Sequence, residues 1–380
     1  MTPKASLASF AAFSLWMGIV GFGGGWAVSQ RIKRTVVLER QWLSEAAFVE
    51  TFSVSSALPG TTATNLLTML GAALVGLPGA VVGAIGFLTP SVALMIAFGA
   101  SYTRLREVHA LATFLDGMSF ATVGVVGAVS VDLGRSAVKS KLSLGIAAGA
   151  AAALATRSLH LAIVIAVAGA AGAILLRDGA GSEPSPPPVS SPRPMVLLAL
   201  PAALVAGSLS LTLFLVFARI GIVTFGGGFA MIPPIEHEVV GVNGWLDPSA
   251  FNDAMVLGQV TPGPVAIAAT FIGYRVDGLS GALAATLGIF GPPFVLSVLV
   301  ARSLAAFRAN LVVRGFLRGV APAVVGVIAA AAVSLWRTSV HDTFGACIAF
   351  AAFALLARYP KLSPLVPLLA GGVVTIVVHR

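Results

Sequence analysis

Charged residues are scarce in this 380-residue chain: lysine, arginine, aspartate and glutamate together make up 10% of it. A soluble domain contains about 25%. Hydrophobic residues make up 57%, and apolar runs such as Leu77–Ala100 and Gly281–Val300 have, or nearly have, the length that crosses a bilayer. The composition therefore indicates an integral membrane protein, and it leaves no stretch large enough for a soluble catalytic domain.

Groups that carry out chemistry are also few. Cys347 is the only cysteine, which excludes a disulfide within the chain and a thiolate metal site. The five histidines are scattered, and we find neither a ligand pair at helical spacing nor a Ser–His–Asp or phosphate-loop motif. We therefore expect no metal, no cofactor and no enzymatic activity. The basic loops of membrane proteins explain most of the net charge of +9, and we expect no nucleic-acid partner.

Two proline–glycine breaks, at Pro59-Gly60 and at Pro262-Gly263, interrupt apolar sequence. Such a pair cannot continue an α-helix, and irregular backbone at membrane depth is tolerated only inside the protein or beside a polar cavity. The flanking segments are shorter than the about 20 residues that a spanning helix needs. We therefore predict two re-entrant helical hairpins, formed by Trp42–Ser56 with Thr62–Val75 and by Trp245–Gly258 with Val265–Val276.

The two halves of the chain repeat each other. Gly18–Gly60 aligns without gaps on Gly221–Gly263, and 17 of the 43 positions are identical, against roughly four expected by chance. The identities include a Phe-Gly-Gly-Gly segment in each half, at Phe22–Gly25 and at Phe225–Gly228. Paired halves with helix breaks at matching positions are typical of secondary transporters.

We therefore predict an all-α polytopic membrane protein built from two inverted-topology repeats, each with about five spanning helices plus a re-entrant helical hairpin. Residues 1–178 are the first transporter repeat, 179–194 a Pro/Ser-rich cytoplasmic linker, and 195–380 the second transporter repeat. The first span of each repeat is expected at Leu7–Gln30 and at Ser208–Ile232, and each contains the glycine triplet of its repeat.

The loop charges indicate the orientation of the repeats. The polar segment after the first glycine triplet is rich in lysine and arginine, whereas its counterpart contains Glu236 and Glu238 and neither lysine nor arginine. Equivalent loops of inverted halves should differ in this way, because basic loops stay in the cytoplasm. Five crossings per repeat then place the linker and the Arg135 loop in the cytoplasm and both termini outside.

An anion site is predicted where the hairpin tips meet near the mid-plane of the membrane. A helix begins after each tip, and the unpaired N–H groups and the dipole of a helix N-terminus bind anions. The glycine triplets could expose further N–H groups, although close helix packing is the commoner role of glycine in membranes.

Ionisable residues inside apolar runs are functional candidates. Arg219 is the strongest, and its partner is predicted to be the anion or a carboxylate such as Asp253 or Glu236. Glu50 and Asp253 occupy equivalent positions in the two hairpins. They are candidates for a coupling proton, although a role facing the polar segment is slightly favoured.

The motifs identify a family. Phe225-Gly-Gly-Gly-Phe-Ala-Met-Ile-Pro, Gln259-Val-Thr-Pro-Gly-Pro and Gly273-Tyr-Arg resemble the chromate ion transporter family in its long, two-domain form. The first half departs from this pattern, since Thr61 follows Pro59-Gly60 and alanines replace the Tyr-Arg pair. The resemblance implies a multi-pass protein of the bacterial inner (plasma) membrane that exports chromate, with sulfate as a related substrate or counter-substrate.

The complete prediction is a chromate-exporting secondary transporter surrounded by membrane lipid, with a homodimer left open. The alternatives are a carrier of sulfate or another oxyanion on the same scaffold, and a non-transporting membrane scaffold. The predicted substrate-binding residues are Gly23, Gly24, Gly25, Pro59, Gly60, Thr61, Thr62, Asn65, Arg219, Gly226, Gly227, Gly228, Gln259, Thr261, Pro262, Gly263, Tyr274 and Arg275.

Overall fold

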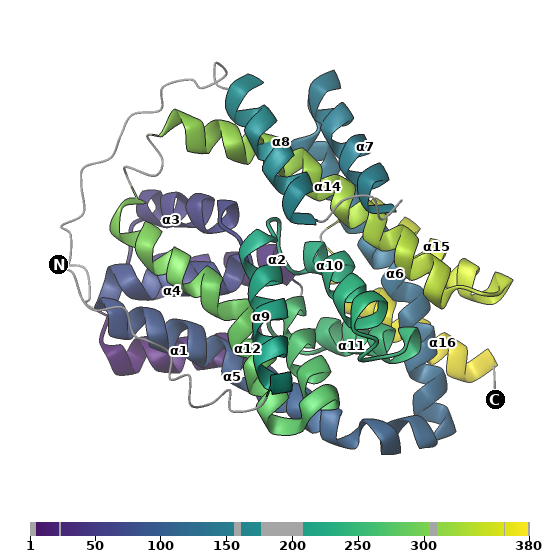
Figure 1. Ribbon diagram of the computed structural model, residues 1–380. Coiled ribbons are helices and arrows are strands. Elements are labelled where there is room, and N and C mark those ends of the chain that lie inside the picture. The colour runs from purple at the N-terminus through teal and green to yellow at the C-terminus, as the bar shows by residue number, and fades with distance from the viewer. Residues whose placement is uncertain are drawn as a thin grey trace.

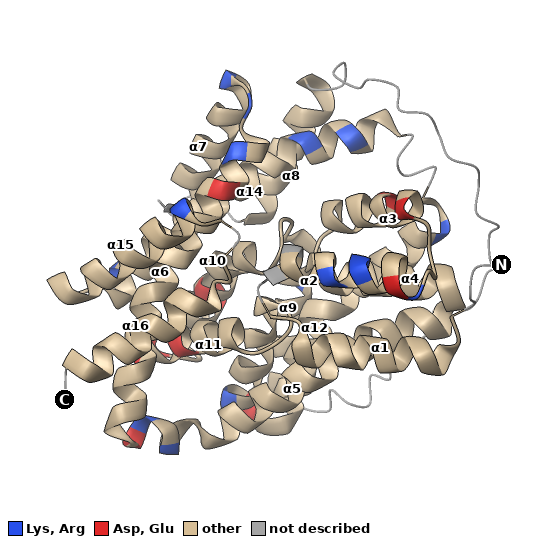
Figure 2. Ribbon diagram, turned by 180° about the vertical axis from the view of Figure 1, so that it is seen from behind, with Lys and Arg blue, Asp and Glu red and all other residues tan. Residues whose placement is uncertain are grey.

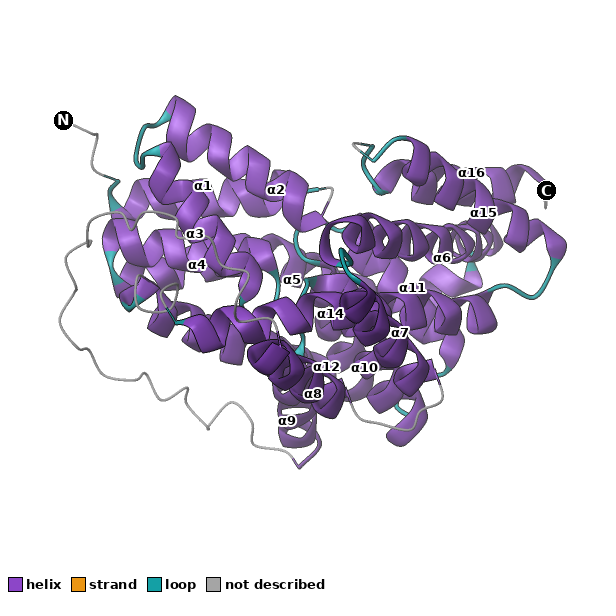
Figure 3. Ribbon diagram, turned by 90° about the horizontal axis from the view of Figure 1, so that it is seen from above, coloured by secondary structure: helices purple, strands orange, loops and turns teal. Residues whose placement is uncertain are grey.

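The structure is a computed structural model that describes residues 5–22, 24–155, 161–175, 208–304, 310–360 and 362–378. All regular elements among these residues are helices (Figure 3). The predicted linker 179–194 and Gly23 of the first glycine triplet lie outside the described residues.

The helices of the two repeats follow each other in the same order (Figure 1). The first repeat contains α1 (Leu7–Val20), α2 (Gly24–Lys33), the π-helix η1 (Arg34–Glu39), α3 (Glu45–Ala57), α4 (Thr62–Val75), α5 (Leu77–Glu107), α6 (His109–Ala137), α7 (Lys141–Ala155) and α8 (Leu161–Leu175). The second repeat contains α9 (Ser208–Val223), η4 (Gly228–Met231), α10 (Ile232–Glu236), the π-helix η5 (His237–Val242), α11 (Pro248–Val260), η6 (Val265–Ile267), α12 (Ala268–Arg302), α14 (Leu311–Ser339), α15 (Thr343–Arg358) and α16 (Leu365–Val378).

The internal repeat predicted from the sequence is confirmed element by element. Both repeats have a π-helix before the first arm of the hairpin, at η1 and at η5. The backbone also breaks at equivalent glycines: Gly76 separates α4 from α5, and Gly278 interrupts α12 at the same place, both with positive φ. The helix α12 is therefore the counterpart of α4 and α5 together.

Four helices of the described chain are long and apolar enough to span a membrane. They comprise Leu77–Glu107, His109–Ala137, Val265–Arg302 and Leu311–Ser339. The other apolar helices have 14 to 16 residues, and each of these rises by only about 21–24 Å. Two long spanning helices and several shorter ones in each repeat make this a polytopic helical membrane protein.

The first predicted span of each repeat is divided in the structure. The helix α1 ends at Val20, and α2 folds back: the guanidinium of Arg31 reaches the carbonyl of Val20, and the ring of Trp42 packs against Phe10 and Phe13. In the second repeat, α9 likewise ends at Val223 before the glycine triplet. Each predicted first span is therefore a second hairpin, because the flexible triplet reverses the chain.

Close contacts at glycines fix the directions of the helices. A Cβ at Gly83 would lie 3.1 Å from Phe10, and one at Gly18 would lie 3.0 Å from Pro90, so α1 runs parallel to α5. The first part of α12 also runs parallel to α5, because Gly263 lies against Ser91 and, further along both segments, Tyr274 packs on Gly99. The chain reverses at Gly278, so the second part of α12 runs opposite to α5. This opposite direction is the inverted relation that the sequence predicted.

We call the end of the bundle where α5 begins the Leu77 face and the end where α5 finishes the Glu107 face. The helix α1 begins at the Leu77 face, and α6 returns there and ends near Arg135. The start of α1 and the Arg135 loop therefore lie on the same side. The sequence placed the N-terminus outside and the Arg135 loop in the cytoplasm, and this prediction is wrong for the N-terminal end. The reason is that α1 is one arm of a hairpin and adds no crossing.

The two faces differ in charge (Figure 2). Lysine and arginine predominate at the starts of α7 and α14, which lie at the Leu77 face. Along α2 and η1 of the same face they lie beside Glu39 and Glu45, and both signs also occur where α5 meets α6. The Leu77 face includes Lys33, Arg34, Lys139, Lys141 and Arg314. The basic loops that the sequence assigned to one side of the membrane therefore lie together at one end of the bundle.

The repeats exchange their last two helices. The helices α7 and α8 of the first repeat pack on α14 of the second, and α15 and α16 pack on α6 of the first (Figure 1). Small residues permit the close approach: a Cβ at Gly319 would lie 2.0 Å from the carbonyl of Ala168, and one at Gly124 would lie 2.1 Å from that of Ala349. The two repeats are consequently one intertwined bundle.

Candidate functional site

The two hairpin tips have the irregular backbone that their sequences predict. Helix α3 ends at Ala57 and α4 begins at Thr62, while α11 ends at Val260 and η6 begins at Val265. Gly60 and Gly263 have φ angles of 95° and 112°, which residues with a side chain rarely adopt. In the first tip, Asn65 Nδ2 donates to the carbonyl of Pro59 at 2.8 Å and Thr61 Oγ1 to Thr64 Oγ1 at 2.8 Å.

Each tip hydrogen-bonds to the loop between the first helix and the glycine triplet of the other repeat, which we call the glycine loop (Gly21 onward in the first repeat, Thr224 onward in the second). The N–H of Gly60 donates to the carbonyl of Thr224 at 2.8 Å, and the N–H of Gly263 donates to the carbonyl of Gly21 at 2.9 Å. Thr224 and Gly21 are equivalent residues that follow α9 and α1. The two contacts form a reciprocal pair across the pseudo-two-fold axis. The N–H groups of these two glycines are therefore occupied, so any anion must use other donors of the tips.

The long helices enclose both tips. A Cβ at Gly60 would lie 2.6 Å from Cβ of Pro293, and one at Gly263 would lie 2.3 Å from Oγ of Ser91. Ser91 Oγ also donates to the carbonyl of Pro262. Pro293 and Ser91 are equivalent residues on α12 and α5, so each long helix closes over the tip of the opposite repeat.

The glycine triplets also lie beside the tips. A Cβ at Gly25 would lie 3.6 Å from Thr62, and a Cβ at Gly228 would lie 2.9 Å from Val265. Gly228 therefore allows close packing of the triplet on the helix that begins after the tip, whereas a Cβ at Gly25 would make only an ordinary contact. Gly226 and Gly227 both have positive φ, and no described atom lies within 4 Å of a Cβ built at Gly227.

Polar side chains surround the second tip as well. Thr261 is buried and donates to the carbonyl of Leu257 at 2.6 Å. Gln259 Nε2 lies 3.4 Å from Thr122 Oγ1 on α6, whereas Gln259 Oε1 is buried without a hydrogen-bond partner in the described part of the chain. Buried polar atoms usually have a partner, so a donor from outside the described protein would satisfy this oxygen.

Arg219 forms an ion pair with Glu238, joining α9 to the π-helix η5. The sequence left two kinds of partner open, the anion or a carboxylate such as Asp253 or Glu236. The carboxylate that pairs with Arg219 in the structure is neither of these two, and the anion stays a prediction. Glu236 accepts a hydrogen bond from Ser334 Oγ at 2.8 Å instead. The π-helix decides which carboxylate faces Arg219, and residue spacing in the sequence does not show a π-helix.

A cavity of about 520 Å³ opens beside this ion pair. It lies between α9, α10, η5, α14 and the ends of α7 and α8. Its polar and ionisable lining residues are Arg219, Glu236, His237, Glu238, Ser334, Arg337 and Thr338. It also reaches Val223, the residue before Thr224. The cavity therefore joins Arg219 to the region of the second glycine loop.

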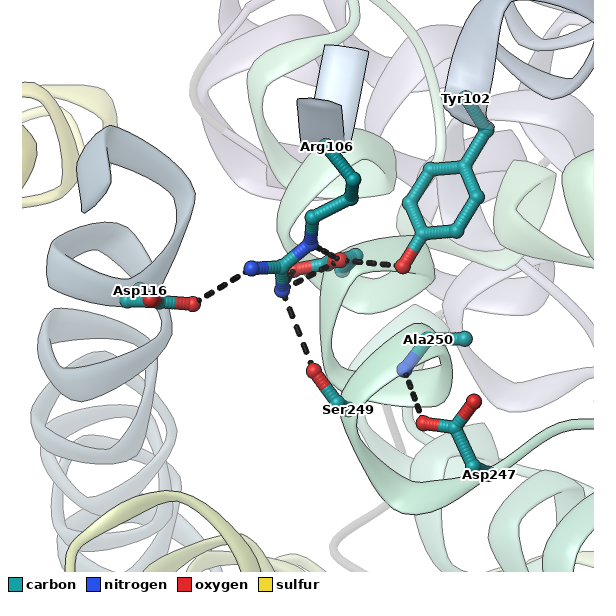
Figure 4. A network of polar contacts seen from close by, with 7 residues as sticks. Tyr102, Arg106, Asp116, Asp247, Ser249 and Ala250 are labelled. Atoms are coloured by element: carbon teal, nitrogen blue, oxygen red, sulfur yellow. Dashed lines mark hydrogen bonds and ion pairs between the residues drawn. The ribbon is translucent and has the colours of Figure 1, made fainter. Parts of the chain in front are cut away.

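A second polar network surrounds Asp253 (Figure 4). Arg106 Nε and Nη2 donate to the two carboxylate oxygens of Asp253 at 2.7 Å, and its Nη1 donates to Asp116 at 2.8 Å. Tyr102 Oη donates to Asp253 at 2.5 Å and Arg106 also reaches Ser249 Oγ at 3.2 Å. Asp253 is 0% exposed. This network ties α11 of the second repeat to α5 and α6 of the first.

The Gly-Tyr-Arg motif supports this network. Tyr274 packs on Gly99, and the guanidinium of Arg275 lies 5.0 Å from the ring centroid of Tyr102. Tyr274 and Arg275 come more than ten residues after the tip glycine, about 15 Å along a helix, so they lie apart from the tips. Glu50, the counterpart of Asp253, is half-buried on α3.

Sequence reasoning did not identify several of these residues. Thr224 and Gly21 act through backbone carbonyls, and no side-chain pattern reveals that role. Glu238 lies in the polar segment after the second glycine triplet, whose charges indicated the orientation of the repeats but no binding role. Arg106 and Tyr102 share one helical face at a spacing of four, and this was a usable signal, but nothing local links them to Asp253, which follows 147 residues after Arg106.

Comparison with known proteins gives consistent matches. The sequence model of one family, described as chromate transporter, matches residues 8–173 and 211–376. The chain is 30% identical to a probable chromate transport protein of Synechococcus elongatus, over 90% of this chain and 87% of that protein. It is 28% identical to the chromate transport protein of Cupriavidus metallidurans and 29% identical to that of Pseudomonas aeruginosa, over 97% of this chain and 92% of each protein. No solved structure matches it.

Proposed function

Because this chain belongs to the chromate transporter family, we propose that it exports chromate, a tetrahedral dianion, across the inner membrane by alternating access. The anion is held near the mid-plane, at the starts of α4 and η6, by backbone N–H groups, with Thr61, Thr62, Asn65, Gln259 and Thr261 around it. The side-chain donors of Thr61, Asn65, Gln259 and Thr261 bond within the protein in this structure and turn to the anion when it binds. Because both helix starts present the positive end of a dipole, no buried lysine or arginine is needed at this point.

The observation that carries this proposal is the reciprocal contact of the tips. Gly60 binds the loop at Thr224, and Gly263 binds the loop at Gly21, so two helix starts and two glycine loops converge. Broken helices that meet at the interface of two inverted repeats form the substrate sites of several secondary transporters. A membrane scaffold has no need of paired breaks at the same depth.

The charge distribution supports an orientation. The Leu77 face has more lysine and arginine than the Glu107 face, and basic ends of spanning helices remain in the cytoplasm. The Leu77 face is accordingly cytoplasmic, and the cavity beside Arg219 lies toward the outer side. A dianion that leaves a cell with a negative interior gains about 2.3 kcal/mol per charge for each 100 mV, so the membrane potential favours export.

The pseudo-symmetry suggests how access alternates. Pro90 and Pro292 are equivalent residues inside α5 and α12, and each directly precedes the residue that covers the tip of the other repeat, Ser91 or Pro293. Proline in a helix removes a backbone hydrogen bond and permits bending. Bending of α5 or α12 at these points changes the cover over one tip without dismantling the other.

Transport in vesicles tests the proposal. Purified protein in proteoliposomes should carry labelled chromate in the direction that an imposed potential favours, and protein-free liposomes should not. Unlabelled sulfate should compete if the site recognises any tetrahedral dianion. Transport of sulfate alone would replace chromate by sulfate as the substrate, and absence of transport of both anions by folded protein would refute the proposal.

A further inference from the structure

The cavity beside Arg219 combines groups that the proposed tip site does not use. The Arg219 side chain is 56% exposed, whereas that of Glu238 is 9% exposed. The carboxylate is thus enclosed, while the guanidinium is accessible to small molecules in the cavity. Arginine has five N–H donors, and the ion pair to Glu238 joins Nη2 to one carboxylate oxygen. Other N–H groups of Arg219 are available to a ligand in the cavity.

A second guanidinium lines the cavity. Arg337 on α14 lines the same space as Arg219, together with Ser334 and Thr338, whose hydroxyls donate within the protein. A volume of about 520 Å³ exceeds many times the roughly 30 Å³ that one water molecule occupies in the liquid. The space therefore accommodates a tetrahedral oxyanion that retains part of its hydration shell between two guanidinium groups.

The charges of the cavity are balanced without an anion. The groups that face Glu238 are Arg219 from α9, Glu236 and His237 from its own segment, and Arg337 from α14. The α7 and α8 lining consists of Leu154 and of residues 161–163, which are apolar. The two arginines and the two glutamates are equal in number, so their formal charges cancel. A dianion that enters adds two negative charges beside an enclosed carboxylate, and this arrangement is unfavourable unless one negative charge is removed.

We propose that the anion replaces Glu238 at Arg219 and that Glu238 takes up a proton at the same time. The only covalent change is the new O–H bond on Glu238. A dianion, the ion pair and one proton from the buffered solution become a dianion paired with Arg219 and a neutral carboxylic acid at Glu238, and the conjugate base of the buffer remains in solution. The proposal deepens and rests on the proposed function. It identifies a second station for the transported anion, between the tips and the Glu107 face, and it links anion passage to one proton.

The two repeats show why this station occurs once. At the positions equivalent to Arg219 and Glu238, the first repeat has Trp16 and Thr35. Neither residue titrates in the physiological range. An exchange of a carboxylate for an anion is therefore possible in the second repeat alone, and the expected proton number per bound dianion is one.

The test is a count of protons during anion binding by the full-length protein in nanodiscs. Sulfate is the probe, because it is a stable tetrahedral dianion, and chromate is titrated in parallel. In weakly buffered solution with a pH indicator, the wild-type protein should take up about one proton for each sulfate bound beside Arg219 and none for a sulfate bound at the tips. Binding without proton uptake would overturn the proposal, whichever variants fold.

Matched variants assign the proton to its residue. Glu238→Gln should bind sulfate at least as tightly and take up no proton, whereas Glu236→Gln, in the same cavity, should retain the uptake. Arg219→Gln should lose tenfold or more in sulfate affinity, and Arg219→Lys should recover only part of it, because lysine cannot make a two-pronged contact. Proton uptake that persists in Glu238→Gln would refute the role of this carboxylate.

Two further measurements distinguish a failure of the proposed role of Glu238 from a failure of the proposed transport function. If Glu238→Gln does not fold, the double variant Arg219→Gln/Glu238→Gln removes both charges and should show no proton uptake linked to sulfate. Transport is measured with the same preparations. Chromate transport by a wild-type protein that takes up no proton would refute this inference and leave the proposed function standing. A folded wild-type protein that neither binds nor transports either anion would refute both.

Discussion

The two repeats have the same backbone plan but differ in where their charges lie. Each has a hairpin tip with a positive-φ glycine, a π-helix at the same position and a break before its long helix. The second repeat adds Arg219 with Glu238, and its Asp253 is fully buried beside Arg106. In the first repeat, Trp16 stands in place of Arg219, and Glu50 in place of Asp253 is half-buried.

This difference separates what the fold requires from what the function adds. Features that occur twice, such as the tip glycines and their partner carbonyls, serve the geometry that relates the repeats. Features that occur once break the symmetry and give the two faces different chemistry. A transporter with a direction needs such asymmetry, because a fully symmetric protein would treat both sides of the membrane alike.

The inverted relation itself can be tested by labelling, and the expected effect is all or none. In a variant without Cys347, single cysteines at Gln41 and at Gly244 occupy equivalent loops of the two repeats. A membrane-impermeant thiol reagent should reach them from opposite sides of the membrane. A cysteine at Ser6 should label from the same side as Gln41, because α1 begins at the Leu77 face. Labelling of all three from one side would contradict the inverted arrangement.

Alanine at the two tips should produce the next largest effect and should distinguish the repeats. Positive φ alone costs about 1–2 kcal/mol for a residue with a Cβ. The new Cβ also meets Pro293 in Gly60→Ala and Ser91 in Gly263→Ala, at 2.6 and 2.3 Å. A serine hydroxyl can rotate whereas a proline ring is fixed, so Gly60→Ala should destabilise more than Gly263→Ala in thermal unfolding.

Two control variants isolate the clash from the backbone strain. Gly227→Ala has a positive φ with open space around it among the described atoms, and it should show the backbone cost alone. Adding Ser91→Ala to Gly263→Ala should recover only part of the stability, because it removes the atom that the new Cβ meets but leaves the cost of the positive φ and deletes the hydrogen bond to the carbonyl of Pro262. Equal destabilisation by Gly227→Ala and Gly60→Ala would show that the close packing at the tip is unimportant.

The fold was more predictable from the sequence than the site. The Pro-Gly pairs and the repeat at a fixed offset showed the hairpins α3–α4 and α11–α12, because proline and glycine restrict the backbone locally. The turn at the glycine triplet was missed, since three glycines permit both a continuous helix and a reversal. The choice between them depends on packing with distant residues such as Trp42.

The site depends even more on distant contacts. The carbonyls of Thr224 and Gly21 become acceptors only when the opposite tip arrives, and residue types give no sign of this. The network of Asp253 with Arg106 and Asp116 likewise joins three helices from two repeats. A carboxylate can find a cation on any neighbouring helix, so one sequence without the packing leaves several partners equally plausible.

The buried and half-buried carboxylates give the third contrast. Asp253→Asn leaves Arg106 without its principal partner, and removing one member of a buried ion pair costs about 3–5 kcal/mol. Glu50→Gln should cost less than about 1 kcal/mol, the scale of a solvent-accessible pair. Chemical or thermal unfolding in detergent measures both. The double variant Arg106→Gln/Asp253→Asn should recover part of the loss, and a Glu50→Gln effect equal to that of Asp253→Asn would contradict the contrast.

A smaller effect than at Asp253 is expected at Tyr102, whose counterpart in the second repeat is Leu304. Tyr102→Phe removes the hydroxyl that donates to Asp253 but keeps the ring under the guanidinium of Arg275. A hydrogen bond to a charged group contributes about 1.5–3 kcal/mol. The bidentate contact from Arg106 continues to hold the carboxylate, so the loss should lie at the low end of this range.

Tyr102→Leu, which copies the residue of the second repeat, should cost more. It also removes the ring that packs on Phe271 at a centroid distance of 5.3 Å and the cation–π contact, which contributes about 0.5–1 kcal/mol at exposed sites. The difference between the Leu and Phe variants in thermal unfolding therefore measures what the ring contributes to the second repeat. In a background with Arg275→Gln, that difference should shrink by the cation–π contribution. An unchanged difference would show that Arg275 does not act through Tyr102.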